Sequence, residues 1–238
     1  QLTDLANQNS IEMTFSKEGS LPALERLASD ESDIVVIAIP EGHSMPDATR
    51  YATYPLAYDI AVIVVNEDNP IGEVSLAQLG GIFGNNETFD YKTWGELGLS
   101  GWTGRGIKAI AAESASSISN EIFKYTALSS NTFKSAVNLV DVASAQKVIS
   151  ADVSCIGLVS RKTDSRRTKT LMISAGDGLP AYGPSVDNVH YGDYPLRLPF
   201  YVVFEIANKD RVKPVLSYLL SENCSKVLEA SGFFVLPD

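Results

Sequence analysis

The sequence predicts an α/β protein, built as one large domain or as two lobes. The chain has 238 residues and an apolar content of 45%, which is enough to bury a sizeable core. In its first half, short apolar runs alternate with helical patterns. That alternation is typical of α/β proteins.

The first half begins with helix and strand patterns in turn. Leu2, Leu5 and Ala6 indicate a helix at the start, and residues 11–15 alternate like a strand. Ser20 is a good N-cap for a helix whose apolar face carries Leu21, Leu24, Leu27 and Ala28. Continuous β-branched runs at 34–39 and 60–65 indicate parallel strands that are buried on both faces.

The second half continues the alternation. Ser75 is expected to cap a short helix, and residues 107–112 are strand-like. A polar loop then precedes a helix that carries Ile118, Ile122 and Tyr125. A helix is expected at 144–149, a strand at 155–159 and a loop at 175–194, which is rich in Gly, Pro, Asp and Tyr. A strand at 196–206 and two helices, the second ending before Gly232, complete the chain.

Composition excludes several functions. With 29 acidic and 19 basic residues, the net charge of −10 argues against nucleic acid as a partner. One basic cluster interrupts this pattern, in a turn-rich stretch typical of a solvated loop: Arg161, Lys162, Arg166, Arg167 and Lys169. No apolar run reaches the roughly 20 residues that span a bilayer.

The cysteines and histidines give little material for a metal site. Cys155 and Cys224 cannot make a disulfide framework or a thiol metal site by themselves, and Cys155 lies in an apolar segment as a small buried residue would. Histidine is the other common metal ligand, and the chain has only His43 and His190. We therefore expect no metal and no cofactor.

One motif resembles a catalytic one. Gly42-His43-Ser44-Met45-Pro46 follows a predicted strand and differs by one residue from the G-x-S-x-G nucleophile elbow. Pro46 replaces the second glycine, and too little sheet precedes the motif for an α/β-hydrolase. A loop after a strand is the favoured interpretation, with an esterase that uses Ser44 and His190 as a minor alternative.

Two helix starts are better suited to holding an anion. Gly19, Ser20 and Leu21 open one helix, and Ser117 and Ser119 lie at the start of another. Free amides and hydroxyls at such positions can hold an oxyanion without a full counter-charge. Each start alone is more often a simple cap, but together they suggest a cleft with polar groups on both sides.

Six stretches in order make the sequence resemble the phosphate-binding proteins of ABC-type phosphate transporters. They are residues 19–24, 33–40, 59–66 with Asn69-Pro70, 76–84 followed by Trp94, 156–159, and a C-terminal set at 194–201, 219–222 and 231–233. The resemblance covers nearly the whole chain. It implies the two-lobed type 2 periplasmic binding protein fold, with mixed sheets and crossing hinge strands.

On that resemblance, lobe one comprises residues 1–63 and 198–238, and lobe two comprises residues 64–197. The family implies a non-enzymatic, extracytoplasmic solute-binding protein, either secreted or lipid-anchored in the periplasm. A small anion or polar solute would lie in the interlobe cleft, and hinge closure would be read by an ABC transporter permease. We expect a monomer.

The sequence departs from the family at the ligand site. Where the family has R-x-x-x-S-G-T, this chain places Glu113 at the arginine, Ser117 at the serine, Ile118 at the glycine and Ser119 at the threonine. A carboxylate repels phosphate, whereas arginine pairs with it. The family's small polar pair after the lobe-one strand is also replaced here, by residues 37–39. In addition, we expect the family's first strand and its turn to be missing or trimmed.

The expected ligand-binding set is therefore Gly19, Ser20, Leu21, Glu113, Ser117 and Ser119. Glu113 would select an amine or hydroxyl on the ligand, or would form an internal salt bridge. The alternative is a sensory or interaction module that reuses the fold without a small-molecule ligand.

Overall fold

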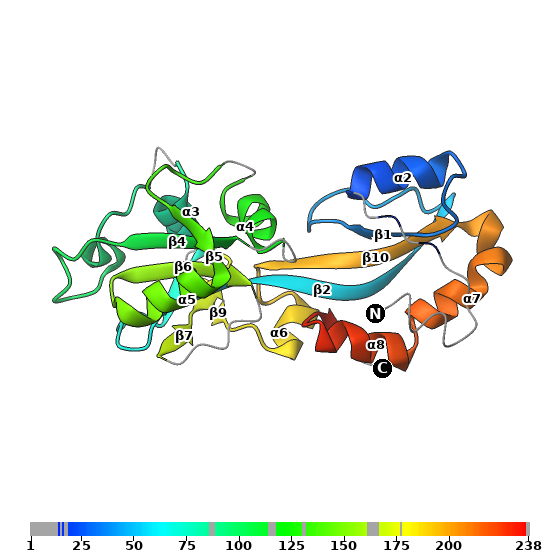
Figure 1. The fold of residues 1–238 in the computed structure, drawn as a ribbon. Coiled ribbons are helices and arrows are strands. Elements are labelled where there is room, and N and C mark those ends of the chain that lie inside the picture. Colours follow the sequence, from blue (N-terminus) through cyan, green and yellow to red (C-terminus); the bar gives the residue numbers. More distant parts are fainter. Residues whose placement is uncertain are drawn as a thin grey trace. The chain divides into compact units, whose positions relative to one another are not determined.

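The computed structural model describes residues 14, 16, 19–85, 89–113, 118–129, 132–160, 167–176 and 178–236. The chain divides into two compact units, each a mixed α/β structure (Figure 1). Unit one comprises Gln1–Asp59 and Leu198–Asp238, and unit two comprises Ile60–Arg197. The domain boundary expected at residues 63 and 64 stays a prediction, and the unit boundary lies earlier in the same strand.

Unit one is a small sheet with helices. Its elements are α2 (Ser20–Ala28), β1 (Val35–Ala38), the first part of β2 (Tyr51–Asn66), β10 (Arg197–Glu205), the short 3-10 helix η2 (Ile206–Asn208), α7 (Lys209–Leu219), α8 (Glu222–Ala230) and β11 (Phe234–Val235). The strand β10 lies between β1 and β2. It pairs antiparallel with β1, with Val203 opposite Val35, and β11 pairs antiparallel with β2.

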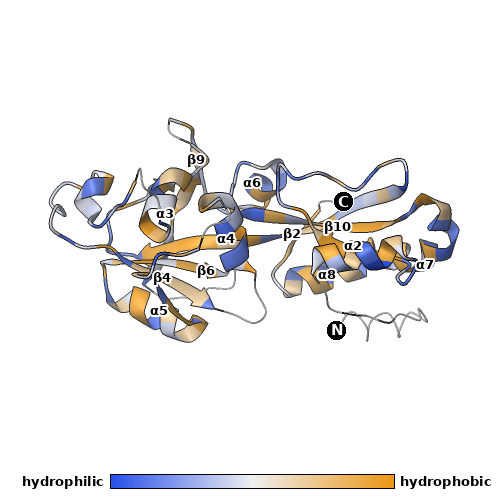
Figure 2. Ribbon diagram, turned by 90° about the horizontal axis from the view of Figure 1, so that it is seen from above, coloured by the Kyte–Doolittle hydropathy of each residue, from blue (hydrophilic) through white to orange (hydrophobic). Residues whose placement is uncertain are grey.

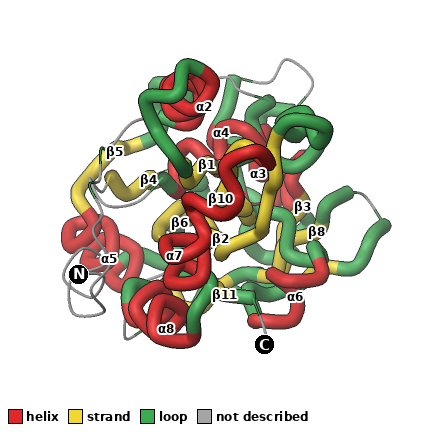
Figure 3. The backbone as a smooth tube through the Cα atoms, turned by 90° about the vertical axis from the view of Figure 1, so that its right-hand side faces the viewer, coloured by secondary structure: helices red, strands yellow, loops and turns green. Residues whose placement is uncertain are grey.

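Helices cover both faces of the unit-one sheet. Successive side chains of a strand point to opposite faces. Val203 accordingly packs with Leu27 of α2, while its neighbour Val202 packs with Leu219 of α7 and Leu228 of α8. Figure 3 shows α2 on one side of these strands, with α7 and α8 on the other.

Unit two carries the larger sheet. Its elements are β3 (Glu73–Ser75), α3 (Leu76–Phe83), the 3-10 helix η1 (Trp94–Leu97), β4 (Lys108–Glu113), α4 (Ser119–Ala127), β5 (Asn138–Asp141), α5 (Val142–Ala151), β6 (Cys155–Ser160), β7 (Thr168–Thr170), β8 (Met172–Ser174), β9 (Ala181–Tyr182) and α6 (Val186–Tyr191). The main sheet runs β2-β6-β4-β5, and β3-β8-β9 form a second sheet. The strand β4 is parallel to β5 and β6, whereas β2 is antiparallel to β6. Apolar residues dominate β4 and β6 (Figure 2).

Buried polar side chains fix the loops of unit two. The Tyr194 hydroxyl is fully buried and donates to the Ala61 carbonyl at 2.8 Å. Asn69, also fully buried, donates to the Val153 carbonyl at 2.9 Å and accepts from the Ile71 amide at 3.0 Å. These bonds give buried polar groups the partners that they need.

Most predicted elements are present, but strand direction was predicted wrongly. The runs at 34–39 and 60–65 belong to β1 and β2. The strand β1 pairs antiparallel with β10, and β2 pairs antiparallel with β6, so neither pairing is parallel. Val36 is 42% exposed, so β1 is not buried on both faces. An apolar run reports burial, whereas strand direction depends on a partner strand that is distant in sequence.

Three local predictions are also wrong. The stretch 175–194 is not all loop, because it contains β9 and α6, which Ser185 caps. Leu21 does not join the apolar face of α2, since it is 75% exposed. Gly19, not Ser20, is the N-cap of that helix.

Some predictions fall outside the described residues. These are the helix at residues 2–6, the strand at 11–15 apart from Thr14, Ser117, and three members of the basic cluster, Arg161, Lys162 and Arg166. Of the remaining members, Arg167 forms ion pairs with Glu67 and Asp68, and Lys169 lies in β7.

Candidate functional site

The start of α2 offers backbone amides. Gly19 is extended (φ −71°, ψ 164°), and the first helical amides belong to Ser20 and Leu21. The next residue, Pro22, has no N–H, and the Ala23 amide already donates to the Gly19 carbonyl at 3.1 Å. Because the first amides of a helix have no intrahelical acceptor, two N–H groups here can face an anion.

The Ser20 hydroxyl does not serve as an anion donor in this arrangement. It donates to the Ala38 carbonyl at 3.1 Å and accepts from the Ala38 amide at 3.0 Å. A hydroxyl has one proton, and that proton is used to join α2 to the end of β1. Of the predicted set in unit one, the amides are therefore the groups suited to a ligand.

The start of α4 has different chemistry. Its N-cap is Ile118, which has no side-chain capping bond, and Ser119 is the first helical residue and is 2% exposed. The first turn also contains Glu121, whose carboxylate forms an ion pair with Lys124 at 2.8 Å. A carboxylate in the first turn suits the positive end of the helix dipole and competes there with any external anion.

The end of β4 carries the predicted Glu113. This residue is exposed and lies in register with Asp141, the last residue of the parallel neighbour β5. Neighbouring strands are about 4.8 Å apart, so two carboxylates end adjacent strands. Asp141 was missed from the sequence, although an Asp directly before a helical pattern is a capping signal.

Asp141 is held ionised by its capping bonds. Its carboxylate accepts from the Ser144 hydroxyl at 2.6 Å and from the Ser144 amide at 3.0 Å. These bonds lower the pKa of Asp141 below its ordinary value. The edge formed by β4 and β5 is therefore acidic, which suits amines and hydroxyls better than phosphate.

The predicted residues fall into two groups. Glu113 and Ser119 both belong to unit two, where β4 leads toward α4, and Gly19, Ser20 and Leu21 belong to unit one. Ser117 lies outside the described residues.

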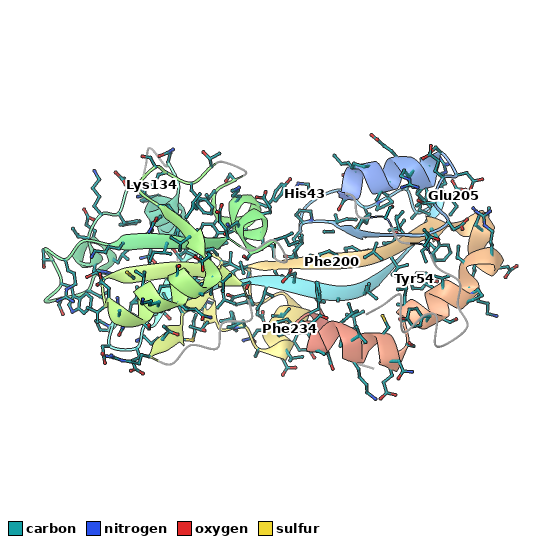
Figure 4. The ribbon with its side chains drawn as sticks, viewed as in Figure 1. His43, Tyr54, Lys134, Phe200, Glu205 and Phe234 are labelled. Atoms are coloured by element: carbon teal, nitrogen blue, oxygen red, sulfur yellow. The ribbon has the colours of Figure 1, made fainter. Side chains whose placement is uncertain are left out.

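The nucleophile-elbow hypothesis is wrong for Ser44. That motif requires a strand, a sharp turn and a helix. Here β1 leads through a turned segment, in which His43 lies (Figure 4), into the strand β2, and Ser44 is exposed. Across the described ranges, no three His, Cys, Asp or Glu residues are grouped as a metal site requires.

The family is established by comparison with known proteins. Residues 1–223 match the PBP superfamily domain. The chain belongs to the PBP superfamily. The fold of this PBP-superfamily chain is that of type 2 periplasmic binding proteins, with mixed sheets.

Two curated relatives of this PBP-superfamily chain are informative. It is 28% identical over 193 residues to the phosphate-binding protein PstS of Pseudomonas aeruginosa, covering 77% of this chain and 59% of the relative. It is 26% identical over 242 residues to protein SphX of Synechococcus elongatus, covering 97% of this chain and 71% of the relative. The match to PstS thus spans little more than half of that protein.

Solved structures show the same fold. An ABC-type phosphate transport receptor from Vibrio cholerae matches with a TM-score of 0.75 at 21% identity, covering 99% of this chain and 93% of the receptor. PstS from Borrelia burgdorferi matches with a TM-score of 0.79 at 14% identity, covering all of this chain and 92% of the other. No helix in the described part of the chain is long and apolar enough to cross a membrane.

Proposed function

We propose that this chain is the solute-binding part of an extracytoplasmic receptor of the phosphate-binding type, which delivers a small anion or polar solute to an ABC transporter permease. The sequence similarity to PstS, together with the family match over residues 1–223, supports this proposal. The receptor is non-enzymatic, monomeric and secreted or lipid-anchored.

The observation that carries the proposal is the set of helix amides at the start of α2. Two N–H groups, those of Ser20 and Leu21, stand at the positive end of a nine-residue helix, and the adjacent Gly19 brings no side chain between them and a ligand. Amides and a helix dipole together favour an oxyanion. We expect these groups to bind the anionic part of the solute.

The acidic end of β4 refines the class of solute. Glu113 and Asp141 repel a second negative charge and accept hydrogen bonds from hydroxyl or amine groups. We therefore propose a solute that combines an anionic group with hydroxyls or an amine.

Calorimetry tests this proposal directly. The protein is unfolded, stripped of ligand by dialysis, refolded and titrated with phosphate, sulfate, sugar phosphates and amino acids. We expect one saturable site for a solute with both an anionic and a hydroxyl or amine group, and weaker binding of phosphate. Absence of saturable heat from every compound would contradict the proposal.

The same absence would favour a sensory or interaction module without a small-molecule ligand. Two observations favour that alternative. The Ser20 hydroxyl is committed to Ala38, and Glu113 stands where the phosphate-binding family has an arginine. The two functions thus give opposite results in a single titration.

A further inference from the structure

Unit two contains a pocket that the proposed solute site does not use. Its volume is about 600 Å³, and its lining comes from the end of α3, the segment before η1, the start of β4 and the segment before β5. Binding pockets for small molecules typically fall between about 300 and 1,000 Å³. All of the lining residues lie within Ile60–Arg197, so the pocket is internal to one unit.

One wall of the pocket is cationic. Lys134, labelled in Figure 4, has a side chain that is only 16% exposed, and its ammonium donates to the Gly81 carbonyl at 3.0 Å and to Asp90 at 3.1 Å. The ammonium of Lys92 lies 3.1 Å from the other oxygen of Asp90. Two cations therefore share one carboxylate, and this wall carries a net positive charge.

The Lys134 ammonium keeps capacity for a ligand. An ammonium has three N–H donors, and the contacts with Gly81 and Asp90 use two of them. Gly81 lies in the last turn of α3, where the negative end of the helix dipole favours the cation. Lys134 is thus held in place as an ordered, largely buried charge rather than a mobile surface one.

Other residues that line the pocket are apolar. Ile82 and Ala109 are buried, and Ile107 is half-buried. Because side chains of extended backbone alternate, Ile107, which directly precedes β4, and Ala109 in β4 are expected on the same side. Lys108 between them does not line the pocket, and it forms an ion pair with Asp152 at 2.7 Å.

A glycine permits the wall to form. A Cβ on Gly81 would lie 2.7 Å from the Tyr91 ring and 2.9 Å from the Phe89 carbonyl. Only the absence of that atom lets the segment carrying Asp90 and Lys92 lie against α3. The two halves of the cationic wall therefore meet because α3 has a glycine at this position.

We propose that this pocket binds a small organic acid, whose carboxylate meets Lys134 and Lys92 and whose apolar body lies on Ile82, Ile107 and Ala109. The charge pattern selects an anion, and the apolar side selects a hydrocarbon or aromatic body over inorganic phosphate. The inference goes beyond the proposed function, since it concerns a second site made entirely by unit two.

The proposal is tested by titrating isotopically labelled protein with hexanoate and with benzoate. The amide chemical shifts are measured at each step of the titration. We expect saturable shifts at Tyr91, Lys134 and Ala136, and none there with hexylamine or phosphate. Lys134→Gln should weaken hexanoate binding at least about tenfold, the loss expected for a hydrogen bond to a charged group. The matched control Lys108→Gln, on the other face of β4, should leave binding unchanged.

A second variant gives an opposite expectation that misfolding cannot imitate. Asp90→Asn removes the carboxylate that competes for both ammonium groups, so hexanoate should bind more tightly. Weaker or unchanged binding by Asp90→Asn, equal binding of hexylamine and hexanoate, or shifts confined to Glu113 and Ser119 would each overturn the proposal. These outcomes do not depend on the proposed solute site. If phosphate and the other solutes failed to bind at the start of α2, the results expected for hexanoate would be the same.

Discussion

Ser20 and Ala38 are joined by two hydrogen bonds, one in each direction, between a hydroxyl at the start of α2 and the backbone at the end of β1. The hydroxyl thereby satisfies both the amide and the carbonyl of Ala38. This pairing gives Ser20 a structural role, and the adjacent amides remain the groups of the proposed solute site.

Ser20→Ala should therefore change stability more than binding. Leaving the Ala38 amide and carbonyl without this partner costs about 1–3 kcal/mol in the free energy of unfolding. Urea denaturation measures the loss, and Ser29→Ala, at the exposed end of the same helix, should stay within about 0.5 kcal/mol of the wild type. Loss of solute binding by a folded Ser20→Ala protein would instead make the hydroxyl a ligand group.

Glu113→Arg should strengthen phosphate binding. The substitution replaces a carboxylate by a guanidinium that pairs with an oxyanion, and an affinity gain of at least about tenfold is expected for such a charge-assisted bond. Calorimetry with phosphate measures the gain. Glu73→Arg, at the exposed first residue of β3, makes the same change in net charge and should have little effect. Equal gains in both variants would show a general charge effect and place Glu113 outside the solute site.

Gly95→Ala should destabilise unit two. A Cβ on Gly95 would lie 2.4 Å from the Cα of Thr103, which is backbone and cannot rotate away. Overpacking of this kind costs about 1–3 kcal/mol. The nearby Gly104 has no atom within 4 Å of the same added carbon, so Gly104→Ala is the control. Thermal unfolding compares the two, and equal midpoints would contradict the close approach.

The sequence predicted elements that have a strong local signal. The apolar runs of β1 and β6 and the capping residue Ser75 were identified from their local patterns. Strand direction was predicted wrongly, and the short strand β5 was not predicted. In β5 Asn138, Leu139 and Asp141 are exposed, so its pattern is weak, and register with β4 holds it in place.

The candidate site was predicted only in part for a similar reason. Helix starts have local signatures, which is why Gly19 and Ser119 were chosen. The pairing of Glu113 with Asp141 depends on strand register, and the contact between Asp90 and Lys134 joins residues 44 positions apart. Such relationships are created by the fold and have no periodicity to reveal them.

Asp141 should make stability depend on acid pH. Its pKa is lowered by the Ser144 bonds, so the stabilisation is fully present above the ordinary value of about 3.9 and is lost as pH falls through the lowered pKa. Asp141→Asn keeps a capping oxygen but removes the titration. The urea midpoint should therefore decrease less between pH 6 and pH 3 for Asp141→Asn than for the wild type. An equal decrease in both proteins would exclude Asp141 as a source of the acid sensitivity.

The two cysteines report unfolding of the two units separately. Cys224 lies in α8 of unit one and Cys155 in β6 of unit two, and both are fully buried. Burial raises the pKa of each thiol to about 11, with the Asp152 charge adding to the effect at Cys155. Because the thiolate is the reactive form, native protein at pH 8 should react negligibly with a disulfide reagent.

Labelling in increasing urea then resolves the units. In Cys155→Ala only Cys224 reacts and follows unit one, while in Cys224→Ala only Cys155 reacts and follows unit two. Hexanoate in the pocket of unit two should protect Cys155 in preference to Cys224, because a ligand stabilises the folded form to which it binds. Rapid labelling of either thiol in the native protein would contradict its burial.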